Sequence, residues 1–108
     1  MNLTEERAAR NEALFREVNE RIEELHEASG EENGAFVCEC GDETCVERLS
    51  VPLDTYETVR NDPRLFLVAP GHETPAIERS IEHDEGFVVV RKDSPVAARI
   101  ADQTDPRA

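Results

Sequence analysis

Three cysteines and one histidine are the residues of this chain best suited to chemistry. Cys38, Cys40 and Cys45 lie within eight residues of one another and are the only cysteines present. His72 follows in the segment Pro70-Gly71-His72-Glu73. Three thiolates and one imidazole make up a tetrahedral donor set that is typical of closed structural zinc sites. The sequence therefore predicts a Zn²⁺ ion bound by Cys38, Cys40, Cys45 and His72.

The fourth ligand has alternatives. His72 follows an apolar segment and lies in a turn, so its ring can be aimed at a fixed point. His83 stands beside Asp84 and suits a solvated turn, while His26 lies late in a long helix, where a cationic imidazole suits the helix dipole. A carboxylate or a water molecule could also take this position. Water would open the site to catalysis, and this is the one route to an enzyme, of a zinc-hydrolase kind.

Other interpretations of the thiols fit the sequence less well. Inert buried cysteines are common, but this segment is acidic and loop-like. A catalytic thiol needs a base and an orienting group, and the short spacing of Cys38 and Cys40 disfavours a disulfide between them. Zinc is preferred over iron because Cys₃His is a common structural zinc set. Gly41 is expected to supply a permissive φ for a turn of the backbone, and Asp42 and Thr44 are expected to bond the loop backbone.

Composition predicts a single domain with a modest core. The chain has 108 residues, of which 38% are hydrophobic and 5% aromatic, with no Trp. A bound metal would help to stabilise so small a core. Three cysteines fit reduced, metal-binding thiols better than a disulfide framework. No apolar run approaches 18 residues and the first residues form a charged helical pattern rather than a signal segment, so we expect a soluble, cytoplasmic protein.

Net charge limits the classes of partner. The formal charge is −13, from 25 acidic and 12 basic residues. Such a surface repels phosphates, which argues against nucleic acid or an anionic membrane as the main partner. An acidic mimic that blocks a nucleic-acid-binding surface is a minor alternative, because acidic runs are usually solvated faces. A protein partner or a second copy of the chain is therefore expected.

The N-terminal segment reads as one long amphipathic helix. It is expected to run from about residue 4 to 28, with Thr4 as N-cap and Gly30 as its stop. Such a helix would be roughly 37 Å long, whereas a domain of this size is about 30 Å across. The helix must therefore lie across the whole domain, project from it or pair with another chain.

The apolar residues of this helix form a stripe close to a heptad pattern. Two readings are open: the stripe packs on the small sheet, or it pairs with a second copy or enters a partner's groove. The stripe residues are Ala8, Phe15, Val18, Ile22 and Leu25, with Leu14 widening the stripe and Asn11 in the remaining seam position.

The rest of the chain predicts an α+β fold: the long N-terminal helix, one small, mostly antiparallel sheet with a C-terminal hairpin, one short helix and a zinc-stabilised loop. Within a single domain we expect the helix over 1–30, the zinc-binding core over 35–92 and a tail over 93–108. The expected elements are a loop over 31–34, strands over 35–37, 48–51 and 65–69, a helix over 53–60 with Asp54 as its cap, hairpin arms over 76–83 and 86–91 around Asp84-Glu85-Gly86, and a short helical piece over 96–101.

Several motifs resemble those of a group of small uncharacterised proteins from high-GC actinobacteria. The first is Phe-x-Cys-x-Cys-x₄-Cys over 36–45, and the second is Arg-x-Phe-x-Val-x-Pro-Gly-His-Glu over 64–73. Residues 10–22, the Val-Val-Val-Arg-Lys segment over 88–92 and the closing Asp-Pro-Arg over 105–107 also match, so the likeness spans nearly the whole chain. The resemblance implies family membership and source, with the three cysteines and His72 at matching positions, and it implies no activity.

Taken together, these patterns favour a small zinc-stabilised protein-interaction or regulatory module. The alternative is a zinc enzyme whose fourth coordination position holds water.

Overall fold

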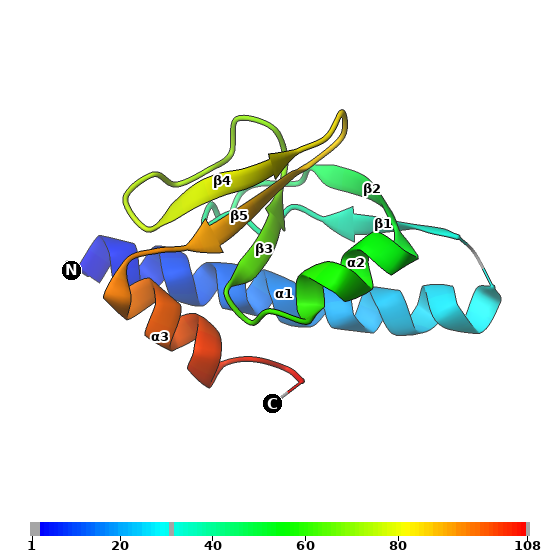
Figure 1. Cartoon of the computed structure of the whole chain (residues 1–108), viewed down its shortest axis with the longest axis horizontal. Coiled ribbons are helices and arrows are strands. Elements are labelled where there is room, and N and C mark those ends of the chain that lie inside the picture. Colours follow the sequence, from blue (N-terminus) through cyan, green and yellow to red (C-terminus); the bar gives the residue numbers. More distant parts are fainter. Residues whose placement is uncertain (1–2, 31, 108) are drawn as a thin grey trace.

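The protein has an α+β fold, as predicted (Figure 1). The computed structural model describes residues 3–30 and 32–107. A long N-terminal helix runs beneath two small sheets, and a short helix lies near the end of the chain. The elements in chain order are α1 (Leu3–Ser29), β1 (Asn33–Val37), β2 (Arg48–Pro52), α2 (Leu53–Arg60), β3 (Leu65–Val68), β4 (Glu78–His83), β5 (Val88–Lys92) and α3 (Pro95–Gln103).

The strands form two antiparallel sheets rather than the single sheet expected. One contains β1 and β2, and the other has the order β3-β5-β4. β1 and β2 are the two arms of the cysteine loop, and they pair from Asn33 opposite Pro52 to Val37 opposite Arg48. β2 is followed at once by α2, which ends its ladder. Asn33, which was expected in the loop over 31–34, already belongs to β1. Glu31 of the same predicted loop lies outside the described residues.

The predicted C-terminal hairpin is present as β4 and β5. Its first arm alternates poorly in sequence, and the structure gives the reason: the register between the two strands shifts between Ser80 and Glu82. Ile81 lies at this irregularity and is 48% exposed. A bulge of this kind adds one residue to one strand and breaks the alternation of the following side chains.

Helix α1 lies across the whole molecule. Its 27 residues correspond to about 40 Å at 1.5 Å per residue, and the longest extent of the molecule is 42 Å. Gly30 ends the helix as predicted, with a φ of 77° and its amide bonded to the carbonyl of His26. The helix already includes Leu3, and the side chain of the predicted cap Thr4 lies outside the described residues.

The buried face of α1 is polar, in contrast to the predicted apolar stripe. Leu14, Val18 and Leu25 are 62%, 41% and 73% exposed, so packing of the whole stripe on a sheet is wrong. Ile22 still packs against the core, and Phe15 is half-buried. The buried residues of the helix are instead Ala9, Glu12, Ala13, Arg16, Asn19 and Glu23.

These buried polar side chains have partners far along the chain. Arg16 donates to the carbonyl oxygens of Pro63 (2.6 Å) and Ala101 (3.0 Å), and its guanidinium lies over the ring of Phe66. The ammonium of Lys92 on β5 contacts the carboxylates of Glu12 on α1 and Glu78 on β4 in the interior. Hydrogen bonds and charge pairing thus offset the cost of removing these groups from water.

The two short helices begin differently from the prediction. Pro52, and not Asp54, occupies the N-cap position of α2, with no side-chain cap, and Asp54 lies in the first turn. Helix α3 is capped by Ser94, whose Oγ accepts from the amide of Ala97 at 3.2 Å. The segment expected as a tail contains α3, which packs against α1. Its buried side chains are Ala97, Ala98, Ile100 and Ala101.

Across the described ranges, 3–30 and 32–107, no helix combines the length and the apolar character needed to cross a membrane.

Candidate metal centre

The cysteine loop continues β1 in nearly extended form. The amide of Cys38 donates to the carbonyl of Glu47 at 3.1 Å, and the amide of Glu39 donates to the carbonyl of Leu67 at 2.8 Å. In an extended chain alternate side chains share a face. Cys38 and Cys40 therefore point toward one side, and the side chain of Glu39 points to the other.

His72 is placed opposite the thiols by a tight turn after β3. Its amide donates to the carbonyl of Ala69 at 2.9 Å, and Gly71 has a φ of 87°, which favours glycine. The amide of Gly71 also donates to Glu73 Oε1 at 3.1 Å. The Pro-Gly-His-Glu segment is thus a turn that aims the imidazole of His72 toward the cysteine loop.

The structure brings the four predicted ligands together. The donor atoms of Cys38, Cys40, Cys45 and His72 all lie within 4.8 Å of one another. His72 Nδ1 is 3.6 Å from Cys38 Sγ and 3.5 Å from Cys45 Sγ. Zinc–sulfur and zinc–nitrogen bonds in a tetrahedron separate sulfur from nitrogen by roughly 3.6 Å. The four residues could therefore hold a metal ion with little rearrangement.

The two other histidines lie elsewhere. His83 is exposed at the end of β4. His26 lies near Phe36, with ring centroids 6.2 Å apart, and its Nε2 accepts from the amide of Ala35. Neither is in the group formed by the three cysteines and His72.

Gly41 has a different role from the one predicted. Among the described glycines, positive φ is found at Gly30 and Gly71 and not at Gly41. A Cβ atom at Gly41 would lie 2.9 Å from the Cβ of Ala8 on α1. Glycine is therefore required for close approach of the loop to the helix, where Asn11 Nδ2 donates to the Gly41 carbonyl at 3.3 Å.

The loop is closed by the side chain of Asp42, as predicted. Its Oδ1 accepts from the amide of Thr44 at 2.9 Å and from the Thr44 hydroxyl at 2.7 Å. These bonds lower the pKa of Asp42. Cys45 follows with its amide bonded to the Asp42 carbonyl at 3.1 Å. The Asp42–Cys45 turn therefore returns the third thiol to the site.

Burial governs the protonation of the two inner thiols. It raises the pKa of Cys38 and of Cys40 above the usual value for a thiol. Amide hydrogen bonds act in the opposite direction, from Ala69 at 3.1 Å to Cys38 and from the Asp42 backbone to Cys40. Without a cation these thiols therefore stay protonated, and a metal would have to displace their protons, which makes its affinity depend on pH.

A buried polar network behind the loop was missed in the sequence. The carboxylate of Glu39 is fully buried and forms two bonds with the guanidinium of Arg60, at 2.9 and 3.0 Å. Glu39 also accepts from the Leu67 amide at 2.9 Å and from Asn19 at 2.7 Å. Asn19 in turn bonds both the amide and the carbonyl of Val37. The alternation Cys-Glu-Cys was the one signal that could have placed Glu39 in the interior.

A second cluster of carboxylates lies between α1 and α2. Glu23, Glu27 and Glu57 approach one another closely enough for a cation. The guanidinium of Arg107 is already bonded to this region, through Glu20, Glu23 and Glu57. This cluster therefore has a cationic partner from the chain itself.

Comparisons with known proteins add no family. No protein-family model matches the chain, and searches of curated proteins and of solved structures find no match. The resemblance to small actinobacterial proteins stays a prediction.

Proposed function

We propose that this protein is a small interaction module stabilised by one structural Zn²⁺ ion at the Cys₃His centre. The observation that carries the proposal is the convergence of four donor atoms from two segments of the chain. Cys45 and His72 are 27 residues apart, and their donor atoms are 3.5 Å apart. A metal at this point links the β1–β2 loop to the turn after β3 and adds its binding free energy to folding.

The donor set supports zinc in a structural role. Thiolates and imidazole suit Zn²⁺ better than hard cations such as Mg²⁺ or Ca²⁺. Four protein ligands close the tetrahedron, whereas catalytic zinc sites keep one position for water. The separations of His72 Nδ1 from two of the thiols match those between two ligands of one zinc ion. This geometry favours the structural role over the enzymatic alternative.

Replacement of the histidine separates these two roles. We expect His72→Ala to lose zinc and to unfold at a lower temperature, because three thiolates alone leave the turn after β3 untethered. The matched control is His83→Ala, at an exposed position outside the group, which should keep both metal content and melting temperature. Zinc retained in His72→Ala with an unchanged melting temperature would contradict a structural role for His72.

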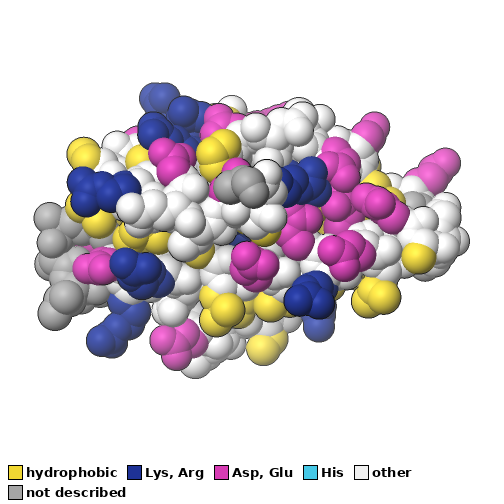
Figure 2. Space-filling view, turned by 90° about the horizontal axis from the view of Figure 1, so that it is seen from below, with side chains coloured by type: hydrophobic (Ala, Val, Ile, Leu, Met, Phe, Trp, Pro, Cys, Tyr) yellow, Lys and Arg dark blue, Asp and Glu magenta, His cyan; other side chains and the backbone are white. Residues whose placement is uncertain are grey.

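The outer face of α1 supports the interaction part of the proposal. Leu14, Val18 and Leu25 are four and seven residues apart, which places them on one side of the helix. All three are exposed, although exposed apolar rows are unusual on monomeric proteins. The view of the molecule from below shows hydrophobic side chains interspersed with arginine and acidic side chains (Figure 2).

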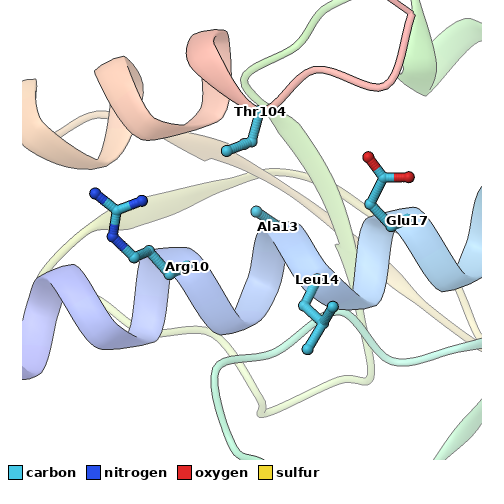
Figure 3. A pocket seen from close by; sticks show the side chains of 5 residues that line it. All are labelled: Arg10, Ala13, Leu14, Glu17 and Thr104. Atoms are coloured by element: carbon cyan, nitrogen blue, oxygen red, sulfur yellow. The ribbon is translucent and has the colours of Figure 1, made fainter.

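A second copy of the chain is the partner that fits this face best. A pocket of about 340 Å³ lies beside Leu14, lined by Arg10, Ala13 and Glu17 of α1 and by Thr104 (Figure 3). In an antiparallel pairing of two α1 helices around a twofold axis, Leu25 of one copy faces Leu14 and this pocket in the other. The same pairing brings Arg21 of each copy near Glu17 of the other, so the contacts are self-complementary.

Oligomeric state tests this pairing. The wild-type protein should sediment as a dimer at micromolar concentration, and Leu25→Glu should sediment as a monomer with unchanged zinc content. Val46→Glu is the control, because Val46 is 87% exposed but lies outside α1. A wild-type protein that stays monomeric over the whole concentration range would exclude self-pairing.

A further inference from the structure

We infer that Cys45 is the reactive thiolate of the metal centre, which hydroperoxides oxidise first and whose oxidation releases the metal. The inference rests on the proposed function, because it concerns the regulation of the same site.

The three thiols are shielded unequally by the backbone. Cys38 Sγ accepts from the amide of Ala69 at 3.1 Å, and Cys38 is 2% exposed. Cys40 accepts from the backbone of Asp42 and is 3% exposed. Cys45 is half-buried, and its thiol contacts the side chains of His72 and Cys40. Exposure therefore distinguishes Cys45 from the two inner thiols.

Amide hydrogen bonds to a metal-bound thiolate draw electron density from the sulfur. A thiolate that accepts such bonds is the weaker nucleophile, and Cys38 is held in this way by the Ala69 amide. Oxidation also follows exposure. Cys45 is the most exposed of the three thiols, so an oxidant in solvent reaches it first.

The surroundings of the site favour a small, uncharged oxidant. Exposed carboxylates flank Cys45 in its own loop, namely Glu43 and Glu47, and Asp42 begins the turn that ends at Cys45. These carboxylates repel anionic reagents, whereas hydrogen peroxide and small organic hydroperoxides carry no charge at neutral pH. An open cleft of about 300 Å³ beside the centre is lined by Cys40 and His72 and not by Cys45, so Cys45 is reached from its own exposed side. The charge around Cys45 therefore points to hydroperoxides as the oxidant class.

The chemistry proceeds in two steps. The thiolate sulfur of Cys45 attacks one oxygen of the peroxide, the O–O bond breaks, and sulfenic acid and hydroxide form. The thiolate of Cys40 then attacks this sulfur and displaces a second hydroxide, which gives a Cys40–Cys45 disulfide. Two thiolates supply the two electrons that reduce the peroxide. The metal keeps only Cys38 and His72 as ligands and leaves, so that the loop and the turn after β3 separate.

Cys40 is the resolving partner because its thiol contacts that of Cys45. The donor atoms of the whole group lie within 4.8 Å of one another, so little movement is needed. Cys38 Sγ is instead held by the Ala69 amide at 3.1 Å.

Time-resolved mass mapping tests the inference on the zinc-loaded protein. The protein is first assayed for bound zinc and then treated with hydrogen peroxide, with a sulfenic-acid trap and a chromophoric zinc chelator present. We expect the trap on Cys45 first, a Cys40–Cys45 disulfide without the trap, and zinc release at the rate of Cys45 modification. First modification at Cys38 or Cys40 in zinc-loaded protein would overturn the inference and leave the proposed function intact. Protein that binds no zinc would overturn the proposed function itself.

A variant that keeps four ligands provides a second test. Cys45→His offers a Cys₂His₂ set, which also binds zinc, and removes the reactive sulfur. Peroxide should release zinc from this variant about tenfold more slowly than from the wild type, because the remaining thiolates are buried and amide-bonded. Equal release rates would overturn the inference. Should the variant bind no zinc, the mass mapping of the wild type still decides the question.

Discussion

At the scale of single residues, Glu39 links the candidate metal centre to the interior. It lies between two predicted ligands in sequence, and its carboxylate is bonded to Arg60, Asn19 and the Leu67 amide. The same backbone segment therefore carries thiols toward the candidate site on one side and a buried anion toward Arg60 on the other. The orientation of Cys38 and Cys40 thus depends on an ion pair that contains no ligand.

Replacing Glu39 by Gln should destabilise the protein strongly. Arg60 is 4% exposed, and its guanidinium would lose its counter-charge in the interior. Breaking one half of a buried pair costs about 3–5 kcal/mol, measured here by denaturant unfolding with zinc present. Glu47→Gln, at an exposed position of the same loop, is the control. Equal stability of both variants would show that the network does not hold the loop.

Gly41 offers a second test at this scale. We expect Gly41→Ala to weaken zinc binding and to lower the melting temperature, because the new methyl group would meet Ala8 at 2.9 Å. The double variant with Ala8→Gly removes the opposing methyl group and should recover part of both losses. A Gly41→Ala protein that binds zinc as tightly as the wild type would exclude a role for this close approach.

The grouping of the three cysteines with His72 could be predicted from the sequence, since three thiols and an imidazole make up a typical zinc donor set. The sequence predicted the wrong role for Gly41, because the residue that it approaches closely, Ala8, is distant in sequence. Glu39 was missed because its acidic neighbours suggest an exposed loop, and its alternation with Cys38 and Cys40 was the one local sign of burial. Contacts between remote segments decide both cases.

At the scale of elements, α1 is the part that differs most from the prediction. Its existence and length follow from composition and from Gly30, and both agree with the structure. Helical periodicity leaves the orientation of α1 open, between packing of the apolar stripe on the sheet and pairing of the stripe with another chain, and the structure excludes packing of the whole stripe. The helix instead buries Arg16 and Asn19, whose partners lie up to 88 residues away. Such partners leave no trace in a local pattern.

Because α1 buries polar side chains and exposes apolar ones, we expect substitutions in it to change stability in an unusual order. Asn19→Ala should cost about 1–3 kcal/mol, because the amide and carbonyl of Val37 and the carboxylate of Glu39 lose hydrogen bonds in the interior. Leu25→Ala, on the exposed face, should change the free energy of unfolding by no more than about 0.5 kcal/mol. Unfolding in urea at concentrations where the protein is monomeric measures both. The reverse order of the two effects would mean that the stripe faces the core.

At the scale of the whole molecule, a buried carboxyl group should make stability depend on pH. Burial raises the pKa of Glu23 from 4.5 to about 8. In the unfolded chain this carboxyl ionises near its ordinary value, so between these limits the native state binds more protons. Stability therefore falls as pH rises, by up to about 1.4 kcal/mol per pH unit.

Denaturant unfolding between pH 6 and 8.5 with saturating zinc checks this dependence. The lower limit avoids loss of metal through protonation of its ligands. The free energy of unfolding should fall across this range in the wild type and fall less steeply in Glu23→Gln, whose amide does not titrate. A wild-type stability that rises with pH over this range would contradict the burial of this carboxyl group.

The division into two sheets defines what a metal would add to stability. The loop between β1 and β2 and the turn after β3 lie at different sheets, and hydrogen bonds of Cys38 and Glu39 already join the loop to β3 and Ala69. A tetrahedral ion bonded to both segments would add a further link at the turn that carries His72. The fold class follows from the sequence, but the division into two sheets does not, because local patterns predict strands and not their pairing.

Native mass spectrometry of the reduced protein, combined with thermal unfolding before and after chelation, tests the central claim most directly. We predict one zinc ion per chain, a melting temperature that falls by 10 °C or more, on the order of 2 kcal/mol for a domain of this size, when the ion is removed, and recovery when zinc is restored. A reduced, folded protein that carries no metal and melts at the same temperature with and without chelator would contradict it.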